Sequence, residues 1–206
     1  MRFDWRRIGQ SNGIAALASA LISCLLIAQS AAEGPSPPRR PALTQRGICA
    51  NHNTPAGVDR YCVSSVLPRD PNVNRFNYGP ESLFDNADNT AWVEGVDGQG
   101  IGEWIVVEFD GLRLVKDIQI RNGYNKDQSI YEKNSRVKEL RVEFSEREKK
   151  VAHLKDTPSQ QSIELPTGKP LHAYWVKFTI ESVYPGIKFE DTAISELHIV
   201  SEPIHP

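Results

Sequence analysis

The sequence lacks any segment with the apolar periodicity of a long amphipathic helix, and it contains no internal repeat. Without crossover helices a parallel α/β sheet is excluded. Apolar and polar residues alternate instead in short runs, as they do in β-strands. These runs lie at 103–109, 116–121, 137–145, 151–155, 162–165, 174–180 and 195–200, and turn formers such as Asp110-Gly111 and Asn122-Gly123 separate them. The pattern predicts an all-β fold of two packed antiparallel sheets, a β-sandwich or jelly roll.

The usual signatures of catalysis are also missing. There is no Gly-x-Ser-x-Gly motif, and His153, His172 and His198 are scattered without metal-motif spacing. An acid pair assembled by folding, as in a glycosidase, would leave no such signature, and a small hydrolase is therefore kept as a third alternative. We expect no enzymatic activity.

Cysteine is scarce, and the first of the three cysteines lies in an N-terminal export signal. Basic residues precede an apolar run from Ile14 to Ala28, and small residues follow at Ser30, Ala31 and Ala32. This layout predicts a signal peptide over residues 1–32 and a secreted or periplasmic protein without a transmembrane helix in the mature chain. An alternative is a lipoprotein, because Leu21-Ile22-Ser23-Cys24 resembles a lipobox in which Cys24 is lipidated. The apolar residues after Cys24 favour simple secretion.

In the mature chain acidic residues outnumber basic residues. Removal of residues 1–32 takes away Arg2, Arg6, Arg7 and Asp4, so a total of 24 basic and 26 acidic residues becomes a formal net charge of −4. We therefore expect no nucleic-acid partner. The two remaining cysteines, Cys49 and Cys62, are an even pair in a chain bound for an oxidising compartment, and we expect a disulfide between them.

Residues 33–75 have little that could form a core. The segment from Gly34 to Pro41 is rich in proline and is expected to be an extended linker. From Cys49 to Asn74 the composition favours loops stapled by the disulfide.

Several motifs occur in order beyond residue 76 and end near residue 201: 83–92 (LFDNADNTAW), 100–104, 122–124, 134–137, 154–156, 184–186 and 191–196. Together they resemble discoidin-like, galactose-binding-type jelly rolls. They are most similar to one branch, the glycan-binding domain attached to certain bacterial NAD glycohydrolase toxins. The resemblance covers 76–201, leaves 202–206 as a tail, and implies a noncatalytic carbohydrate-binding module.

The resemblance also implies a structural calcium ion that ties the first loop of the jelly roll to its last strand. Asp85 and Thr90 would supply side-chain oxygens, Ser82, Ala87 and Ser195 backbone carbonyls, and Glu196 a carboxylate. An oxygen-only set of this kind suits Ca²⁺. The alternative is that Asp85 only organises its own turn while Glu196 pairs with a nearby cation.

A dense polar cluster between two predicted strands is the candidate glycan site. Recognition of a sugar needs aromatic faces against its C–H side and planar polar groups for its hydroxyls. The cluster and a later loop supply both kinds: Tyr124, Asn125, Lys126, Tyr131, Asn134 and Arg136, joined by Tyr184, Lys188 and Asp191. The alternative is that Arg136 pairs with Asp191 and the tyrosines cover the sandwich edge. Trp92, Trp104 and Trp175 are expected in sheet or core packing instead.

The sequence thus predicts an exported, noncatalytic module that binds a glycan or a glycosylated surface. The alternative is a protein-interaction module of the same fold, a subunit of an envelope or secretion complex, in which the same loop contacts polypeptide.

Overall fold

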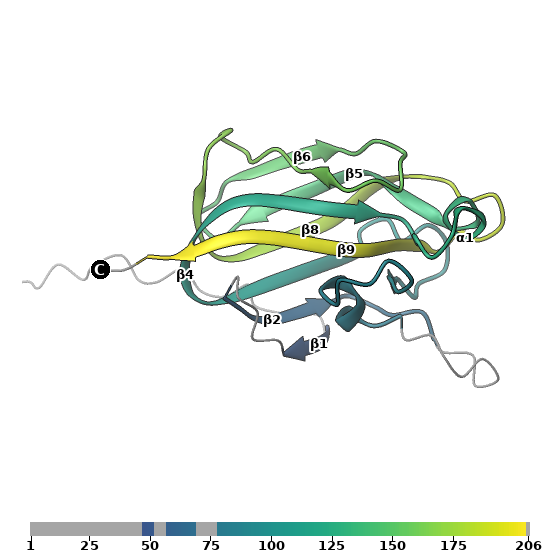
Figure 1. Ribbon diagram of the computed structural model, residues 1–206, viewed down its shortest axis with the longest axis horizontal. Coiled ribbons are helices and arrows are strands. Elements are labelled where there is room, and N and C mark those ends of the chain that lie inside the picture. The colour runs from purple at the N-terminus through teal and green to yellow at the C-terminus, as the bar shows by residue number, and fades with distance from the viewer. Residues whose placement is uncertain (1–46, 52–56, 69–77, 205–206) are drawn as a thin grey trace, which may run out of the picture. The chain divides into compact units, whose positions relative to one another are not determined.

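The computed structural model describes residues 47–51, 57–68 and 78–204. The predicted signal peptide, Cys24 and the proline-rich linker lie outside these ranges. Within them the regular secondary structure is almost entirely β-strand (Figure 1). The strands are β1 (Ile48–Asn51), β2 (Val58–Val63), β3 (Trp92–Val93), β4 (Trp104–Asn122), β5 (Ser135–Phe144), β6 (Lys149–His153), β7 (Gln161–Ser162), β8 (Leu171–Tyr184) and β9 (Thr192–Pro203). The helices are the 3-10 turn η1 (Pro80–Leu83) and the single-turn α1 (Gln128–Lys133), and none in the described ranges has the length and apolarity to span a bilayer.

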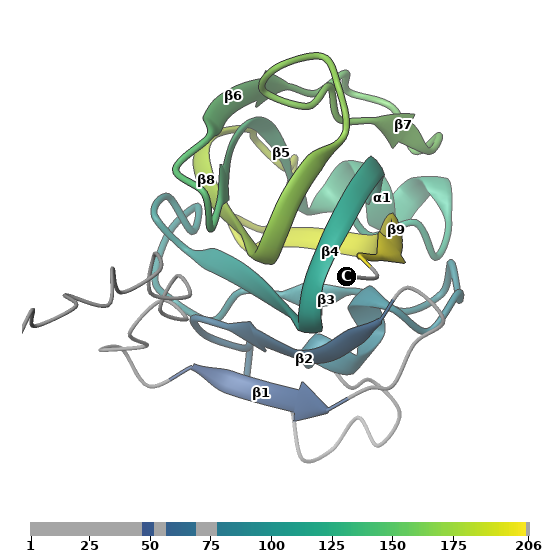
Figure 2. The ribbon, with the colours of Figure 1, turned by 90° about the vertical axis from the view of Figure 1, so that its left-hand side faces the viewer.

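The strands form one continuous hydrogen-bonded sheet in the order β1-β2-β4-β8-β5-β9-β3, with β6 on β5 and β7 on β4. Figure 2 shows that this sheet curls around a common interior. Strand pairs are antiparallel except at one place, where Ser135 and Arg136 of β5 lie parallel to Thr192 and Ala193 of β9. The predicted all-β antiparallel jelly roll is confirmed.

The interior is filled by the alternating apolar residues of β4, β5, β8 and β9. Leu140 and Val142 of β5 face Ile180 and Phe178 of β8, and all four are buried. Trp92 and Trp104 are buried as well, which agrees with the packing role expected of the tryptophans. The period-two pattern therefore identified the inward face correctly, because successive strand residues point to opposite sides of the sheet.

Strand β4 joins two strands that were predicted separately. Two strands separated by a turn at Asp110-Gly111 were predicted, whereas a single strand extends from Trp104 to Asn122; Figure 1 shows that this strand bends at the end of the sandwich near the C-terminus and that its second part runs back toward α1. The β8 partner runs unbroken past this point, pairing Trp175 with Glu108 and then Ala173 with Arg113, and the extra residues of β4 form an irregularity in the register. The irregularity falls between Glu108 and Arg113, where the turn at Asp110-Gly111 was predicted, and the strand bends there.

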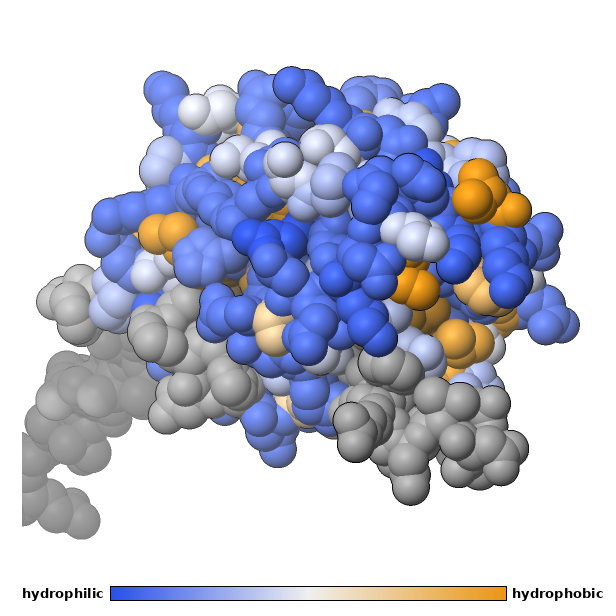
Figure 3. Space-filling view, turned by 45° about the vertical axis from the view of Figure 1, so that its right-hand side comes forward, coloured by the Kyte–Doolittle hydropathy of each residue, from blue (hydrophilic) through white to orange (hydrophobic). Residues whose placement is uncertain are grey.

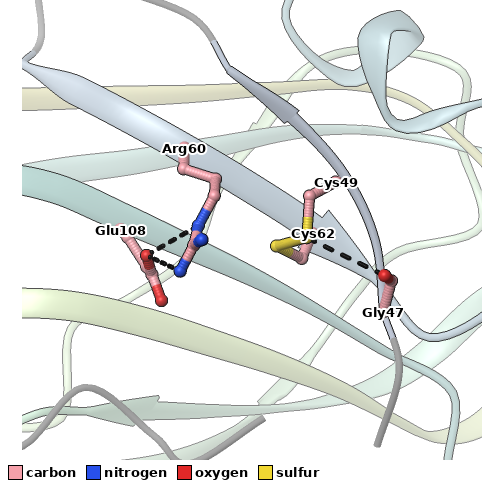
Figure 4. The surroundings of a disulfide bond; sticks show 5 residues. All are labelled: Gly47, Cys49, Arg60, Cys62 and Glu108. Atoms are coloured by element: carbon pink, nitrogen blue, oxygen red, sulfur yellow. Dashed lines mark hydrogen bonds and ion pairs between the residues drawn. A yellow bond between two sulfur atoms is a disulfide. The ribbon is translucent and has the colours of Figure 1, made fainter.

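The segment expected to be a disulfide-stapled loop is also partly strand. β2 pairs with β4, and Val58, Tyr61 and Val63 are buried, so this part of the chain belongs to the sandwich. β1 lies on the other side of β2, where Cys49 stands directly opposite Cys62 and the two form the predicted disulfide (Figure 4). Next to it, Arg60 donates two hydrogen bonds to Glu108 Oε2, at 3.0 and 2.7 Å. The loop prediction is wrong for β1 and β2, because the pairing of β2 with β4 and of β1 with β2 supplies the order that their sparse apolar content does not indicate.

Candidate ligand-binding site

The predicted glycan cluster lies at the end of the sandwich opposite the C-terminus, where α1 and the β8–β9 connection meet (Figure 1). The cluster was expected to be a loop, but it contains α1. Asp127 begins this helix, since its carboxylate accepts a hydrogen bond from Ile130 N at 2.8 Å and so satisfies a backbone donor of the first turn.

The connection from Pro185 to Asp191 packs its backbone against the end of α1. Ile187 N donates to Glu132 O at 3.0 Å, and the amides of Lys188 and Phe189 both donate to Lys133 O, at 3.2 and 2.8 Å. The last carbonyls of a helix have no partner within the helix, and here the neighbouring connection supplies their donors. The backbone of residues 187–189 is therefore fixed while the side chains extend outward.

Arg136 forms the centre of a polar network under these two segments. Its guanidinium donates to both carboxylate oxygens of Asp156, at 3.0 and 2.6 Å, and to the carbonyls of Asn134 and Pro185, both at 3.0 Å. Tyr131 stacks beneath it, with Arg136 Cζ 5.2 Å from the ring centroid, and donates its hydroxyl proton to Asp156 Oδ1 at 2.9 Å. These contacts tie β5, α1 and two connections together.

The charges of this network are mutually stabilising. Hydrogen bonds from Arg136 hold the pKa of Asp156 below its ordinary value, although partial burial acts in the opposite direction. Burial, followed by the Asp156 carboxylate, raises the pKa of the Tyr131 hydroxyl. The proposed Arg136–Asp191 pair is not formed, because Asp156 occupies the guanidinium instead.

A cavity of about 310 Å³ opens beside the network. Its walls carry three aromatic rings, Tyr78, Tyr124 and Phe189, and an aliphatic floor made by Leu67, Val93 and Ile130. The rings of Tyr78 and Tyr124 meet edge to face at 88°, with their centroids 6.3 Å apart. The volume lies at the lower end of the range for small-molecule sites, about 300–1,000 Å³. The cavity is therefore matched to one small ring rather than to a long chain.

Two polar side chains, those of Asn134 and Asp191, complete the wall. Asn134 donates to Ile130 O at 2.8 Å, which orients its amide group. Burial raises the pKa of the Asp191 carboxyl and, to about 12, that of the Tyr124 hydroxyl. The wall thus combines aromatic faces with one amide and one carboxylate.

The nine residues predicted for glycan contact divide into three groups. Tyr124, Asn134 and Asp191 line the cavity. Tyr131, Arg136 and Tyr184 make internal hydrogen bonds instead, the last of them to Leu154 O at 3.0 Å, and so act on the site through the scaffold.

The remaining three lie outside the cavity wall. Asn125 bonds to Ser195 and Asn122, Lys126 is exposed, and Lys188 places its ammonium 4.9 Å from the ring centroid of Phe189.

Sequence reasoning missed Tyr78, Phe189 and the aliphatic floor. Phe189 left a usable signal, since an aromatic residue two positions before Asp191 in a polar connection is a candidate for ligand contact. Tyr78 left none, because it reaches the site from a distant part of the chain.

Four of the predicted calcium ligands, Asp85, Ala87, Thr90 and Glu196, meet where the turn after η1 approaches β9. Asp85 accepts hydrogen bonds from Ala87 N at 2.9 Å and from the Thr90 hydroxyl at 2.7 Å, and Glu196 accepts one from Asn86 N at 3.0 Å. Burial and the nearby Asp85 carboxylate raise the pKa of Glu196 to about 8. In the described ranges no three His, Cys, Asp or Glu side chains converge as a metal centre. Two nearby carboxylates, with the Thr90 hydroxyl beside one of them, nevertheless fit a hard cation.

A second cavity of about 320 Å³ lies between β4, β7 and the β7–β8 connection. Lys116, Asp117, Glu164 and Lys169 contribute to its wall, but no aromatic ring does so among the residues described there. It lacks the flat apolar faces that sugar rings stack on, and the first cavity remains the better candidate.

Comparison with known proteins agrees with this architecture. The sequence profile of the NAD glycohydrolase translocation F5/8 type C domain matches residues 54–200. The match begins ahead of the expected residue 76, which is consistent with β2 being part of the sandwich. No curated protein sequence matches the chain.

Two solved structures show the same fold. A chain of the Clostridium perfringens ZmpB protein, comprising its CBM32-1 and CBM32-2 domains in complex with GalNAc, superimposes with a TM-score of 0.53 at 15% identity. The match covers 77% of this chain and 40% of that one. The arabinofuranosyltransferase AftD from Mycobacteria gives a TM-score of 0.52 at 17% identity, over 74% of this chain and 10% of that one. The protein thus spans less than half the length of each of these longer chains.

Proposed function

The chain belongs to the NAD glycohydrolase translocation F5/8 type C domain family, and from that membership and the geometry of its loop-end cavity we propose that it binds a glycan without transforming it. The observation that carries the proposal is the meeting of three aromatic rings, an amide and a carboxylate in one cavity. Aromatic faces accept the C–H side of a pyranose, while Asn134 and Asp191 offer hydrogen-bonding groups to its hydroxyls.

A noncatalytic role is consistent with the charges in the cavity. Glycoside hydrolysis uses two carboxyl groups on either side of the scissile bond. Among the described residues of the wall, Asp191 is the single carboxylate. The ligand would accordingly be held and released unchanged.

We propose further that the protein works outside the cytoplasm. The Cys49–Cys62 disulfide supports this location, because such bonds persist in oxidising compartments. Secretion or residence in the periplasm, with lipidation at Cys24 as the alternative, would place the cavity among cell-surface and extracellular glycans.

A structural calcium ion is part of the proposal. Asp85 and Glu196 would supply carboxylate oxygens, Thr90 its hydroxyl, and Ser82, Ala87 and Ser195 their carbonyls. The ion would neutralise two carboxylates that otherwise repel each other, and it would fix the turn at 85–90 against β9.

A protein-interaction module remains a second candidate on one observation. Ile187 is 77% exposed beside the cavity, and Phe189, at its wall, is 39% exposed. Orange apolar groups stand out from a largely blue surface in Figure 3. Exposed apolar side chains of this kind are frequent in contacts with polypeptide.

One pair of substitutions separates the two candidates on a glycan array. Phe189→Ala removes a ring from the cavity wall, whereas Ile187→Ala shortens a more exposed apolar side chain of the same connection that does not line the cavity. For a glycan-binding site we expect saturable binding that is lost in Phe189→Ala and kept in Ile187→Ala. Absence of sugar binding in the unmodified protein, together with a copurifying protein that Ile187→Ala releases, would establish the second candidate.

A further inference from the structure

The Asp191 carboxylate lies in the cavity wall without a counter-ion. Among the described residues no lysine, arginine or histidine comes within ion-pair distance of it. Asp156, by contrast, accepts two hydrogen bonds from the Arg136 guanidinium. The same guanidinium also donates to Pro185 O, in the connection that carries Asp191. The negative charge of Asp191 is therefore available to a ligand.

Other acidic groups reinforce the negative potential of the cavity. Glu94 is fully buried, its oxygens accept hydrogen bonds from the amides of Thr192 and Val96 at 3.0 and 2.9 Å, and the Asp191 carboxylate adds to the larger effect of burial in raising the pKa of Glu94. Glu190 precedes Asp191 in the chain and raises the pKa of its carboxyl further, after the larger effect of burial. Lys126, Lys133 and Lys188 do not line the cavity.

The aromatic rings add to the same preference. The face of an aromatic ring carries partial negative charge and attracts ammonium groups within about 6 Å of the centroid. Tyr78 and Tyr124 stand perpendicular to each other, so a group in the cavity can meet the face of one and the neighbouring edge of the other. A ligand carboxylate would meet only repulsion from Asp191, together with the cost of losing its water.

We propose that the cavity selects its ligand by charge: it binds sugars bearing a free ammonium group most tightly, binds neutral sugars less tightly, and excludes uronic and sialic acids. The inference rests on the proposed glycan binding and specifies the class of glycan. Asp191 would pair with the ligand ammonium, and the rings of Tyr78, Tyr124 and Phe189 would enclose it.

Two matched pairs of monosaccharides test the inference by isothermal titration calorimetry. Galactosamine and N-acetylgalactosamine differ in whether the amine is charged, and galactose and galacturonic acid differ in whether a carboxylate is present. We expect galactosamine to bind about tenfold more tightly than its acetylated partner, the equivalent of one favourable charge contact. We expect galacturonic acid to show no measurable binding.

Asp191→Asn keeps the shape of the side chain and removes its charge, so it should bring galactosamine and N-acetylgalactosamine to similar affinities. Glu190→Gln is the matched control, because it removes a neighbouring charge that does not line the cavity, and it should keep most of the difference. In the unmodified protein, rising salt should weaken galactosamine binding more than galactose binding. This salt measurement needs no variant and is therefore independent of any effect of substitution on folding.

The outcomes distinguish the inference from the proposed function. If galacturonic acid binds as tightly as galactosamine, or if the preference survives Asp191→Asn, selection by charge is wrong while glycan binding stands. If none of the four sugars and no glycan of the array binds, glycan binding is wrong and the inference falls with it.

Discussion

Arg136 and Asp156 form a two-point ion pair, with Nε 3.0 Å from Oδ1 and Nη2 2.6 Å from Oδ2. The pair joins β5 to the β6–β7 connection, and the same guanidinium reaches Pro185 O in the β8–β9 connection. Asp156→Asn would leave a buried guanidinium without its counter-ion, and we expect a loss of about 2 kcal/mol of unfolding free energy. The value lies below that of a fully buried pair because Asp156 is partly exposed. Urea unfolding measures the loss, and Lys116→Gln, which breaks an exposed pair with Glu202, should change stability far less.

The lowered pKa of Asp156 also makes the stability of the folded protein depend on pH. Its pKa in the folded protein is lower than its ordinary value of 3.8, chiefly because Arg136 stabilises the carboxylate. The contribution is therefore fully present above pH 3.8 and is lost as the pH falls through the lower folded-state pKa. Asp156→Asn should flatten this part of the stability profile, as followed by thermal unfolding from pH 5 to pH 2. An unchanged slope in the variant would mean that other carboxylates control acid unfolding.

Gly123 and Gly168 provide a matched test of close packing beneath the cavity. Both have positive φ, +81° and +67°, but a Cβ at Gly123 would lie 2.6 Å from Tyr131 and 2.7 Å from Arg136, whereas one at Gly168 would meet nothing within 4 Å. Gly168→Ala should cost about 1 kcal/mol from backbone strain alone. Gly123→Ala should cost about 2–4 kcal/mol, because overpacking adds to the strain. If urea unfolding shows the same loss of unfolding free energy in both variants, Tyr131 and Arg136 can move to accommodate the added methyl group and overpacking does not contribute.

The disulfide should contribute to the free energy of unfolding and to the attachment of β1 to β2. β1 pairs only with β2 within the described strands, and Cys49 and Cys62 are 13 residues apart in sequence. A link closing a loop of this length stabilises by about 3 kcal/mol in the chain-entropy account. The double variant Cys49→Ser/Cys62→Ser should lose about that amount and should lose amide-exchange protection first in β1. Addition of a reductant should destabilise the unmodified protein and leave the double variant unaffected.

Calcium should raise the thermal unfolding midpoint of the unmodified protein, and a chelator should reverse the rise. Glu196→Gln removes one of the two carboxylates and should abolish the calcium response. Glu202→Gln, at the far end of β9, serves as the control and should keep it. A midpoint that is the same with calcium and with chelator would contradict the proposed ion.

The inward faces of the strands and the disulfide were predictable, because each depends on local period or on the pairing of two cysteines. The continuous hydrogen bonding of β4 on both sides of the predicted turn at Asp110-Gly111 was not, since it depends on the partner β8. The roles of Tyr131 and Arg136 were equally out of reach. Their partner Asp156 comes from the β6–β7 connection, and no local spacing specifies that contact. Three of the nine residues predicted for glycan contact, Tyr131, Arg136 and Tyr184, make internal hydrogen bonds of the scaffold instead.

Tyr78 illustrates the same limit for the cavity. It packs against Tyr124 through a contact that depends on the whole fold bringing η1 and α1 to one end of the molecule. Sequence reasoning identified the residue types that a sugar site needs, and the tertiary structure determines which residues of those types line the cavity.

The backbone of residues 187–189 is held by the carbonyls of Glu132 and Lys133, and its side chains have no part in that attachment. Shape and recognition are therefore separable at this connection. Substitutions at Ile187, Lys188 and Phe189 can alter which molecule is recognised while the path of the chain stays the same. Divergence of specificity within such domains would then proceed by exchange of a few side chains on an unchanged frame, without the loss of stability that usually accompanies remodelling of a binding loop.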